Sequence, residues 1–344
     1  MNIKEKTESI CGLPGPAGFE EQVALYAKKE LDNYMDKTWI DVMGNVIGVR
    51  YCGREKPKKL LFDAHIDEIG FIVTGVEEGF LKFSTLGGFD ARVIPAAEVM
   101  VCSQPPVYGV ISVLPPHILK KEDTEKNFKI EDLFIDIGQT HDEAVKLVQP
   151  GTHGVFTTKI RRLGDDLIYG KAIDDRAGFV SILYALDMLK DIQLDVDLYV
   201  MASVQEEVGV RGAATGAYSI DPDYCVVIDV DHAKTPDAKP TEANIELGEG
   251  VVITRGPNMN PGFTEKIVEL AKNNDIKYQI NVMATGSSGT NARAIQISRE
   301  GVVTALFGLP LRYMHSANEV SSTNDIKNTA RLLFETTKAM KGVI

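Results

Sequence analysis

The stretch Tyr199-Val-Met-Ala-Ser-Val-Gln-Glu-Glu-Val-Gly209 joins an apolar strand to a pair of acids, Glu206 and Glu207. Open α/β sheets bind their ligands at the carboxyl ends of their strands, which is where this pair lies. Neighbouring residues at a strand end point in opposite directions, so one carboxylate can bind a metal while the other faces the group that the metal activates. The stretch therefore predicts an α/β sheet that carries an acid pair with two roles.

Other side chains that can bind metals occur in the same structural context. His65 and Asp67 follow one apolar strand, and Asp229 ends another. Asp174 stands where a helix is predicted to begin, and His315 follows a further apolar run. Because parallel strands end, and the loops after them begin, at one edge of such a sheet, we expect these residues to lie close together there.

The composition limits the possible partners. The chain has 344 residues, with 37 basic and 49 acidic side chains and a formal net charge of −12. This length favours two domains, and this charge repels phosphate backbones and anionic lipids, so we expect neither nucleic acid nor a membrane as a partner. No apolar run approaches the ~20 residues that span a bilayer. The N-terminus lacks the apolar core of a signal peptide, so we expect a cytoplasmic protein.

Periodicity divides the chain into an α/β part and a β-rich part. Near-continuous apolar strands at 197–203 and 224–229 are typical of a sheet covered on both faces. After residue 70, short β-rich runs separated by glycine and proline predict a small barrel or sandwich. The other predicted elements are helices at 18–36, 141–148, 175–190, 261–273 and 323–341, strands at 38–51, 59–64, 277–283 and 302–307, and a charged loop at 120–127.

The fold class follows from this division. We predict an α/β fold in which a mixed central sheet is sandwiched by helices and an all-β barrel domain is inserted. The catalytic domain is then discontinuous, with residues 1–66 and 165–344 on either side of an insert at 67–164.

The cysteines are interpreted as reduced residues of the core. They form no C-x-x-C pair and show no regular spacing, and two of them lie in apolar strand-like runs. They are Cys11, Cys52, Cys102 and Cys225. The lack of cysteine ligands argues against a closed structural zinc site.

The two histidines and three of the carboxylates suit a pair of divalent ions that share one bridging carboxylate. Imidazole and carboxylate ligands favour Zn, Co or Mn over Ca or Mg. Two ions about 3.5 to 4 Å apart make a bridging water acidic enough to exist as hydroxide near neutral pH, and they polarise a carbonyl oxygen. The expected cofactor is two divalent metal ions per subunit, and the expected chemistry is hydrolysis.

Five strings, taken together and in order, resemble the tetrahedral (TET) aminopeptidases, the glutamyl aminopeptidase family of co-catalytic dinuclear metallopeptidases. The strings are Asp63-Ala-His-Ile-Asp-Glu-Ile-Gly70, Lys171-Ala-Ile-Asp-Asp-Arg-Ala-Gly178, Val204-Gln-Glu-Glu-Val-Gly-Val-Arg-Gly212, Ile228-Asp-Val-Asp-His-Ala233 and Arg312-Tyr-Met-His-Ser316. The resemblance extends over nearly the whole chain. It implies a zinc-peptidase-like sheet and a PDZ-like inserted barrel that forms dimers, which assemble into a tetrahedral dodecamer.

The resemblance also implies a role for each metal ligand. Asp174 is the expected bridging ligand. His65 and Asp229 complete the site of one ion, and Glu207 and His315 complete the site of the other.

Two further acids are expected to act beside the ions rather than on them. By the resemblance, Glu206 is the general base that takes the proton of the bridging water and passes it to the leaving amine. Asp67 is expected to orient the imidazole of His65 and to raise its basicity.

The chain departs from the family pattern at positions near the expected site. Asn291 replaces an expected acid and Arg293 replaces a small residue, which concerns the substrate preference. Asp231 stands where a threonine is common and adds negative charge within reach of the metals. A guanidinium at Arg293 would pair with an acidic first residue of the substrate, although a surface arginine is the preferred interpretation. These departures leave the side-chain preference open.

The expected function is a metal-dependent aminopeptidase that removes N-terminal residues from short peptides through a hydroxide bound to two metals. A deacylase of N-acyl amino acids or peptides would use the same metal pair on the same kind of carbonyl. A non-catalytic assembly or peptide-binding protein is disfavoured, because neither a ligand nor a catalytic acid is missing.

Overall fold

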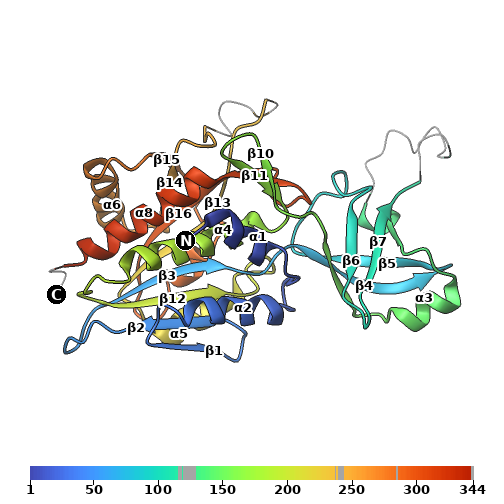
Figure 1. Ribbon diagram of the computed structural model, residues 1–344, viewed down its shortest axis with the longest axis horizontal. Coiled ribbons are helices and arrows are strands. Elements are labelled where there is room, and N and C mark those ends of the chain that lie inside the picture. The colour runs from blue at the N-terminus through green and yellow to red at the C-terminus, as the bar shows by residue number, and fades with distance from the viewer. Residues whose placement is uncertain (115–117, 119–128, 237, 239–243, 284–285, 342–344) are drawn as a thin grey trace.

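The computed structural model describes residues 1–114, 118, 129–236, 238, 244–283 and 286–341. A sheet covered by helices forms the larger part of the molecule, and a smaller β-barrel lies beside it (Figure 1). The charged loop predicted at 120–127 lies outside the described residues.

The described residues of the larger part form an 11-stranded mixed sheet. Its main path runs β1-β2-β12-β3-β13-β16-β17-β11-β10, and β14 pairs with both β15 and β16. The central neighbours β12, β3, β13 and β16 are parallel, as are β14 and β15, whereas the other pairs are antiparallel. The bounds are β1 Lys37–Ile40, β2 Val46–Arg50, β3 Lys59–His65, β10 Arg161–Leu163, β11 Leu167–Gly170, β12 Asp197–Ser203, β13 Tyr224–His232, β14 Val251–Arg255, β15 Tyr278–Val282, β16 Val303–Arg312 and β17 Glu319–Ser322.

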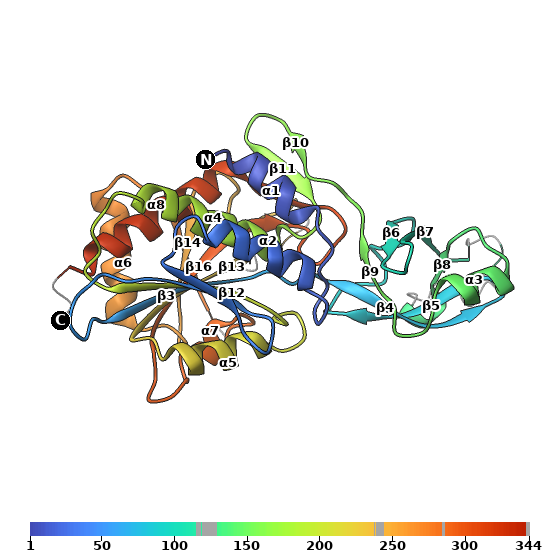
Figure 2. The same ribbon diagram turned by 60° about the horizontal axis from the view of Figure 1, so that its bottom comes forward.

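Helices cover both faces of this sheet. One apolar core joins α1, α2, α4, α6 and α8 to one face, and a second core joins α5 and α7 to the other. In Figure 2, α4 and α8 lie above the sheet and α5 and α7 lie below it. The bounds are α1 Ile3–Cys11, α2 Glu21–Leu31, α4 Ile173–Leu189, α5 Arg211–Ile220, α6 Pro261–Asn273, α7 Ala292–Ile295 and α8 Thr323–Ala339.

Local sequence explains where two of these helices begin. At α6, the side chain of Asn260 accepts a hydrogen bond from the N–H of Phe263, and Pro261 occupies the first turn, where no donor is needed. At α8, the side chain of Ser322 accepts from the N–H of Asn324. Both helices begin at the residue that the sequence predicts.

The second part of the molecule is a closed antiparallel barrel with its own apolar core. Its strands pair in the order β4-β5-β8-β7-β6-β9. The bounds are β4 Gly70–Glu77, β5 Phe80–Leu86, β6 Glu98–Val101, β7 Val107–Ser112, β8 Phe134–Asp136 and β9 His153–Phe156, with the short helices η1 Ile130–Asp132 and α3 His141–Leu147 beside them.

The predicted fold class, a mixed sheet between helices with an inserted barrel, is confirmed. The domain limits at 67 and 164 stay a prediction. Strand β10 lies before the second limit, yet it pairs with β11 in the large sheet.

Several predicted elements agree with the structure, and the disagreements have physical reasons. The helix predicted at 18–36 is confined to α2, because Gly18 has a φ of +90° and the chain turns after Leu31. Helices α1 and α5 and strands β8, β10, β11, β14 and β17 were not predicted; α5 consists largely of small residues. All four cysteines are free, and three of them are buried. Among the described helices, none combines the length and the apolar character that crossing a membrane requires.

Candidate metal centre

Three parallel strands bring their carboxyl ends to one edge of the sheet. The register pairs His65 at the end of β3 with Ser203 at the end of β12, and Val227 of β13 with Asp63 of β3. Residues two apart on a strand share a face, so Asp229 points to the same side as Val227. Val227 belongs to the apolar core between the sheet and helices α5 and α7, so Asp229 lies on the face of the sheet that these two helices cover.

Asp174 lies between two histidines from different elements. Its Oδ1 is 3.1 Å from Nε2 of His65, and its Oδ2 is 3.5 Å from Nε2 of His315. Asp174 and Asp175 depart from helical dihedral angles at the start of α4, which turns the carboxylate toward the strand ends. Each oxygen of Asp174 therefore faces a different potential metal ligand.

The predicted ligands form two groups that share Asp174. In one group, atoms of His65, Asp174 and Asp229 all lie within 4.8 Å of one another. The other group brings Asp174 together with Glu207 and His315 under the same limit. Nε2 of His315 is 3.3 Å from Oε2 of Glu207.

Burial keeps these carboxylates away from water. It raises the pKa of Asp229 and of Glu207 well above their ordinary range, and neighbouring acids add to the effect. Burial lowers the pKa of His65, but its contacts with Asp174 and Asp67 outweigh this effect, so the pKa stands well above its ordinary value. Buried carboxylates this close together repel one another when they are ionised, so their charge is neutralised either by protons or by cations.

The two adjacent glutamates are oriented by one acid. Oδ1 of Asp67 accepts a hydrogen bond from the N–H of Glu206, and Oδ2 accepts from the N–H of Glu207, both at 3.1 Å. Asp67 also lies against His65, with its carbonyl oxygen 3.2 Å and its Oδ1 3.5 Å from Nδ1. Glu207 falls within a ligand group, whereas Glu206 does not. Burial raises the pKa of the Glu206 carboxyl to about 7.

The backbone adopts left-handed conformations, which are strained for residues other than glycine, beside several of these side chains. Ala172, which precedes α4, has a φ of 56°, and Gln205, which precedes the glutamates, has a φ of 57°. His315 itself has a φ of 58°. Non-glycine residues in this region cost roughly 1–3 kcal/mol each and persist where the surrounding structure imposes them, as it often does at functional sites.

Comparison with known proteins agrees with this geometry. The sequence profile of the family described as M42 glutamyl aminopeptidase matches residues 44–332. Lysyl aminopeptidase of Pyrococcus furiosus is 34% identical over 335 residues, which are 95% of this chain and 94% of the relative. The chain belongs to the M42 family. It is therefore an aminopeptidase, a hydrolase of peptide bonds, and the predicted resemblance is confirmed.

Solved structures of TET peptidases have the same fold. A TET aminopeptidase from a marine sediment archaeon (Thaumarchaeota) superposes with a TM-score of 0.92 at 34% identity, over 98% of this chain and 96% of that one. The TET1 peptidase of Pyrococcus horikoshii, which can assemble into a tetrahedron or a large octahedral shell, gives a TM-score of 0.85 at 30% identity, over 98% and 99% of the two chains.

The donor set of this M42 chain fits a pair of divalent ions. Two imidazole nitrogens and three carboxylates converge, and one carboxylate has an oxygen on each side. No cysteine is among these ligands, and nitrogen with oxygen donors suits first-row metals. M42 enzymes are metal-dependent, and these groups are the candidate ligands.

One acid that the sequence analysis missed connects both sides of this centre. Glu319 is 2% exposed, and its Oε2 accepts from the N–H of Ile173 at 2.8 Å and of Asp174 at 3.1 Å. Its Oε1 accepts from the N–H of His315 at 3.2 Å. Glu319 stands four positions after the predicted ligand His315 and begins the short strand β17, and this proximity in sequence is the signal that could have revealed it.

A second missed network holds the N-terminal segment against the centre. Glu68 forms buried ion pairs with Lys171 at 2.8 Å and with Arg176 at 3.1 Å. Arg176 is completely buried and also donates to the carbonyl oxygens of Ile10 and Ile66. These charged residues lie within the quoted strings, so the sequence shows their charges. It does not show that they are buried or which residues they pair with.

The three departures from the family pattern lie in different environments. Asn291 is 1% exposed and donates from Nδ2 to Asp63 and to Ser203, at 2.9 Å each, so it braces the sheet rather than facing a substrate. Arg293 is exposed on α7, and its charge lowers the pKa of Glu206, where burial and nearby acids act in the opposite direction. Asp231 is half-buried and accepts from Nδ2 of Asn281 at 2.7 Å.

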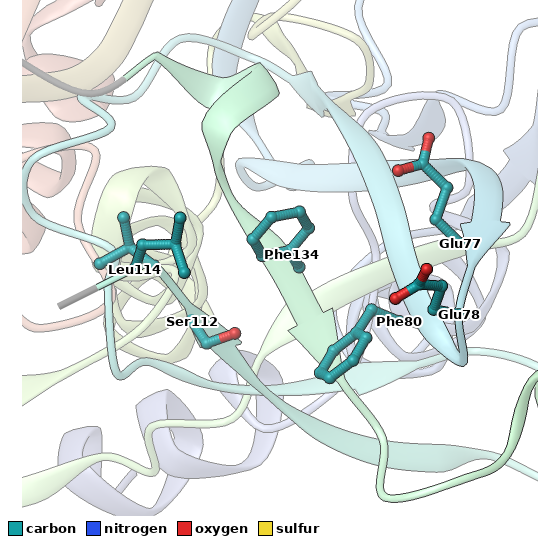
Figure 3. Close-up of a pocket in the computed structure, with 7 residues that line it drawn as sticks. Glu77, Glu78, Phe80, Ser112, Leu114 and Phe134 are labelled. Carbon is teal, nitrogen blue, oxygen red and sulfur yellow. The ribbon is translucent and has the colours of Figure 1, made fainter. Parts of the chain in front are cut away.

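A separate pocket of ≈ 610 Å³ opens on the barrel (Figure 3). The rings of Phe80 and Phe134, with centroids 6.2 Å apart, line it together with the carboxylates of Glu77 and Glu78. None of the predicted site residues lines this pocket. The convergence of candidate ligands lies instead at the edge of the large sheet.

Proposed function

We propose that this M42 enzyme is an aminopeptidase that removes N-terminal residues from short peptides with the help of two divalent ions, Zn, Co or Mn, in each subunit. The observation that supports this most strongly is the position of Asp174, whose two oxygens face His65 and His315 on opposite sides. A carboxylate in that position can serve both ions at once.

The ligands divide between the two ions in this proposal. His65 and Asp229 would complete the site of one ion, and Glu207 and His315 would complete the site of the other, with Asp174 shared. When bound, such ions polarise the peptide carbonyl and lower the pKa of water.

Glu206 is the proposed general base. It adjoins the ligand Glu207 but belongs to neither ligand group, so its carboxylate is available for proton transfer. In this role it takes the proton of the attacking water and returns it to the amine that leaves. A pKa raised by burial to about 7 suits a group that must hold and release a proton near neutral pH.

Asp67 is the proposed positioning residue for both parts of the centre. Because its carboxylate accepts from the N–H groups of Glu206 and Glu207, it fixes the loop that carries them. Its contacts with Nδ1 of His65 leave Nε2 facing Asp174.

The assembly is also a proposal. We infer that the barrel, at 67–164, forms dimers and that dimers assemble into a tetrahedral dodecamer. The P. horikoshii TET1 peptidase, which resembles this chain over its whole length, supports a closed assembly of this kind. The relatives are named for different N-terminal residues, so their names leave the side-chain preference of this enzyme open.

One experiment tests the proposed chemistry. The protein is stripped of metal, reconstituted separately with Co, Zn and Mn, and assayed on matched peptides with free and acetylated N-termini. We expect metal-dependent release of the first residue from the free peptides alone. Glu206→Gln should keep its metal and lose roughly 10²- to 10⁴-fold in kcat.

Two further variants make the result specific. Glu207→Gln should lose metal as well as activity, and Glu300→Gln, an exposed acid, should lose neither. Cleavage of acetylated substrates alone would replace the proposal with a deacylase. Peptide binding without turnover under any metal would replace it with a binding protein.

A further inference from the structure

Asp231 lies beside the metal centre on the same strand as one of its candidate ligands. It stands two positions after Asp229 on β13, so the two side chains share a face and their Cα atoms are about 7 Å apart. Ile228 and Val230, which alternate with them, point into the core on the opposite face. Asp231 therefore lies further along β13 than Asp229, on the same face, at a position that is paired with Pro310 of β16.

The carboxylate of Asp231 is held in place by its surroundings. Its Oδ2 accepts from Nδ2 of Asn281 at 2.7 Å, which ties β13 to β15. A Cβ at Gly308 on the neighbouring strand would come within 2.9 Å of the Asp231 Cβ, so the glycine leaves room for this side chain. The aspartate is thus oriented before any ligand binds.

This fixed carboxylate pairs with no lysine or arginine in the described part of the chain. The opposing charge that acts on it there is that of the neighbouring His232 imidazole, which lowers the pKa of Asp231 against the larger effect of burial. Its one side-chain hydrogen-bond partner, Asn281, is neutral. A half-buried carboxylate without a lysine or arginine counter-ion is costly, and a cationic ligand offsets that cost.

We propose that Asp231 selects substrates whose N-terminal residue is lysine or arginine, by pairing with the cationic end of that side chain. This inference rests on the proposed function, because it needs the first residue of a peptide to lie at the metal centre. The flexible four-carbon stem of lysine separates its backbone from its charge, which matches an acid set to one side of the reacting carbonyl.

Arg293 leads to the opposite expectation, since its guanidinium would favour an acidic first residue. Arg293 is exposed on α7, a helix of four residues, and no side-chain hydrogen bond or ion pair holds it among the described residues. Asp231, in contrast, is half-buried and held by Asn281. A charge held in one orientation by a hydrogen bond discriminates between substrates better than one without such a contact, so Asp231 is the stronger determinant.

The test compares peptides that differ only in their first residue: lysine, arginine, norleucine and glutamate. Norleucine has the chain length of lysine without its charge, so the ratio of kcat/KM for lysine to that for norleucine isolates the charge. We expect this ratio to be at least about tenfold in the natural enzyme and to fall toward one in Asp231→Asn. The asparagine can still accept from Asn281.

A matched control and a measurement without mutation complete the design. Asp165→Asn removes the same charge from a 99% exposed side chain of the β10–β11 turn and should leave the ratio unchanged. In the unmutated enzyme, free lysine should inhibit at a lower concentration than free norleucine. Cleavage of all the peptides with a ratio near one, a preference for glutamate, or an unchanged ratio in Asp231→Asn would overturn the inference but leave the proposed function. A natural enzyme that cleaves none of the peptides would overturn both.

Discussion

The carboxylate of Glu319 accepts a hydrogen bond from the backbone N–H of Asp174 at 3.1 Å. The same glutamate accepts from the N–H of His315, so one buried side chain sets the distance between two candidate ligands of one ion. Neither contact uses a ligand atom, which leaves both ligand side chains available for the metal.

Glu319→Gln should therefore weaken metal binding without removing a ligand. The amide places an N–H₂ group against a backbone N–H, and two donors cannot share a hydrogen bond. We expect metal affinity to fall roughly 10- to 100-fold, with the ion at Asp174, Glu207 and His315 lost first. Titration calorimetry and metal analysis of the apo protein measure this directly. Glu265→Gln, at an exposed ion pair with Arg255, is the control, and equal metal binding by both variants would refute the expectation.

Arg176→Met should destabilise the fold through the N-terminal segment. The substitution leaves Glu68 with only Lys171 as a charged partner and removes the donor to the carbonyl oxygens of Ile10 and Leu13. Breaking a buried pair of this kind costs about 3–5 kcal/mol. Urea denaturation of the variant gives the value, and Arg162→Met, at an exposed ion pair, should change it little. A loss below about 1 kcal/mol in Arg176→Met would contradict this account.

The sequence predicts the sheet and the convergence of the candidate ligands because both depend on local patterns. Apolar runs such as 197–203 mark strands that are buried on both faces, and polar residues directly after them must lie at the strand ends. That rule is enough to bring His65, Glu207 and Asp229 to one edge. Their grouping around Asp174 follows from the parallel register of β12, β3 and β13.

The supporting contacts could not be predicted because they join distant segments through the backbone. Glu319 meets Asp174 across 145 residues of sequence, and its partners are N–H groups, which every residue except proline carries. Asn291 likewise reaches Asp63 across 228 residues. Sequence patterns identify a side chain of the right chemistry, but only the folded chain shows which backbone group it binds.

Asp325→Asn should remove one source of pH-dependent stability. Burial raises the pKa of Asp325 to about 7, against the hydrogen bonds that it accepts from the N–H groups of Gly248 and Gly250. A folded-state pKa above the unfolded value means that the folded protein binds the proton more tightly. Its contribution is complete below the unfolded pKa of about 4 and is lost as pH rises to about 7.

The measurement is the difference in unfolding free energy between the natural protein and Asp325→Asn at several pH values. We expect this difference to fall between about pH 4 and 7, within a total of about 4 kcal/mol, and to stay constant above pH 8. Parallel stability curves for the two proteins would show that Asp325 does not titrate in this range.

Removal of metal should lower thermal stability, because the buried acids of the centre then lose their counter-ions. Asp174, Asp229 and Glu207 lie within two groups that share one carboxylate, and protons become the only means of neutralising them. An ion present at 100 times its dissociation constant contributes about 2.7 kcal/mol, which for a chain of this length corresponds to roughly 4 °C in Tm for each site. Differential scanning calorimetry with and without a chelator measures the change. In Asp174→Asn, where both groups lose their shared ligand, the chelator should have little effect, and an equal fall in both proteins would place the stabilising ions elsewhere.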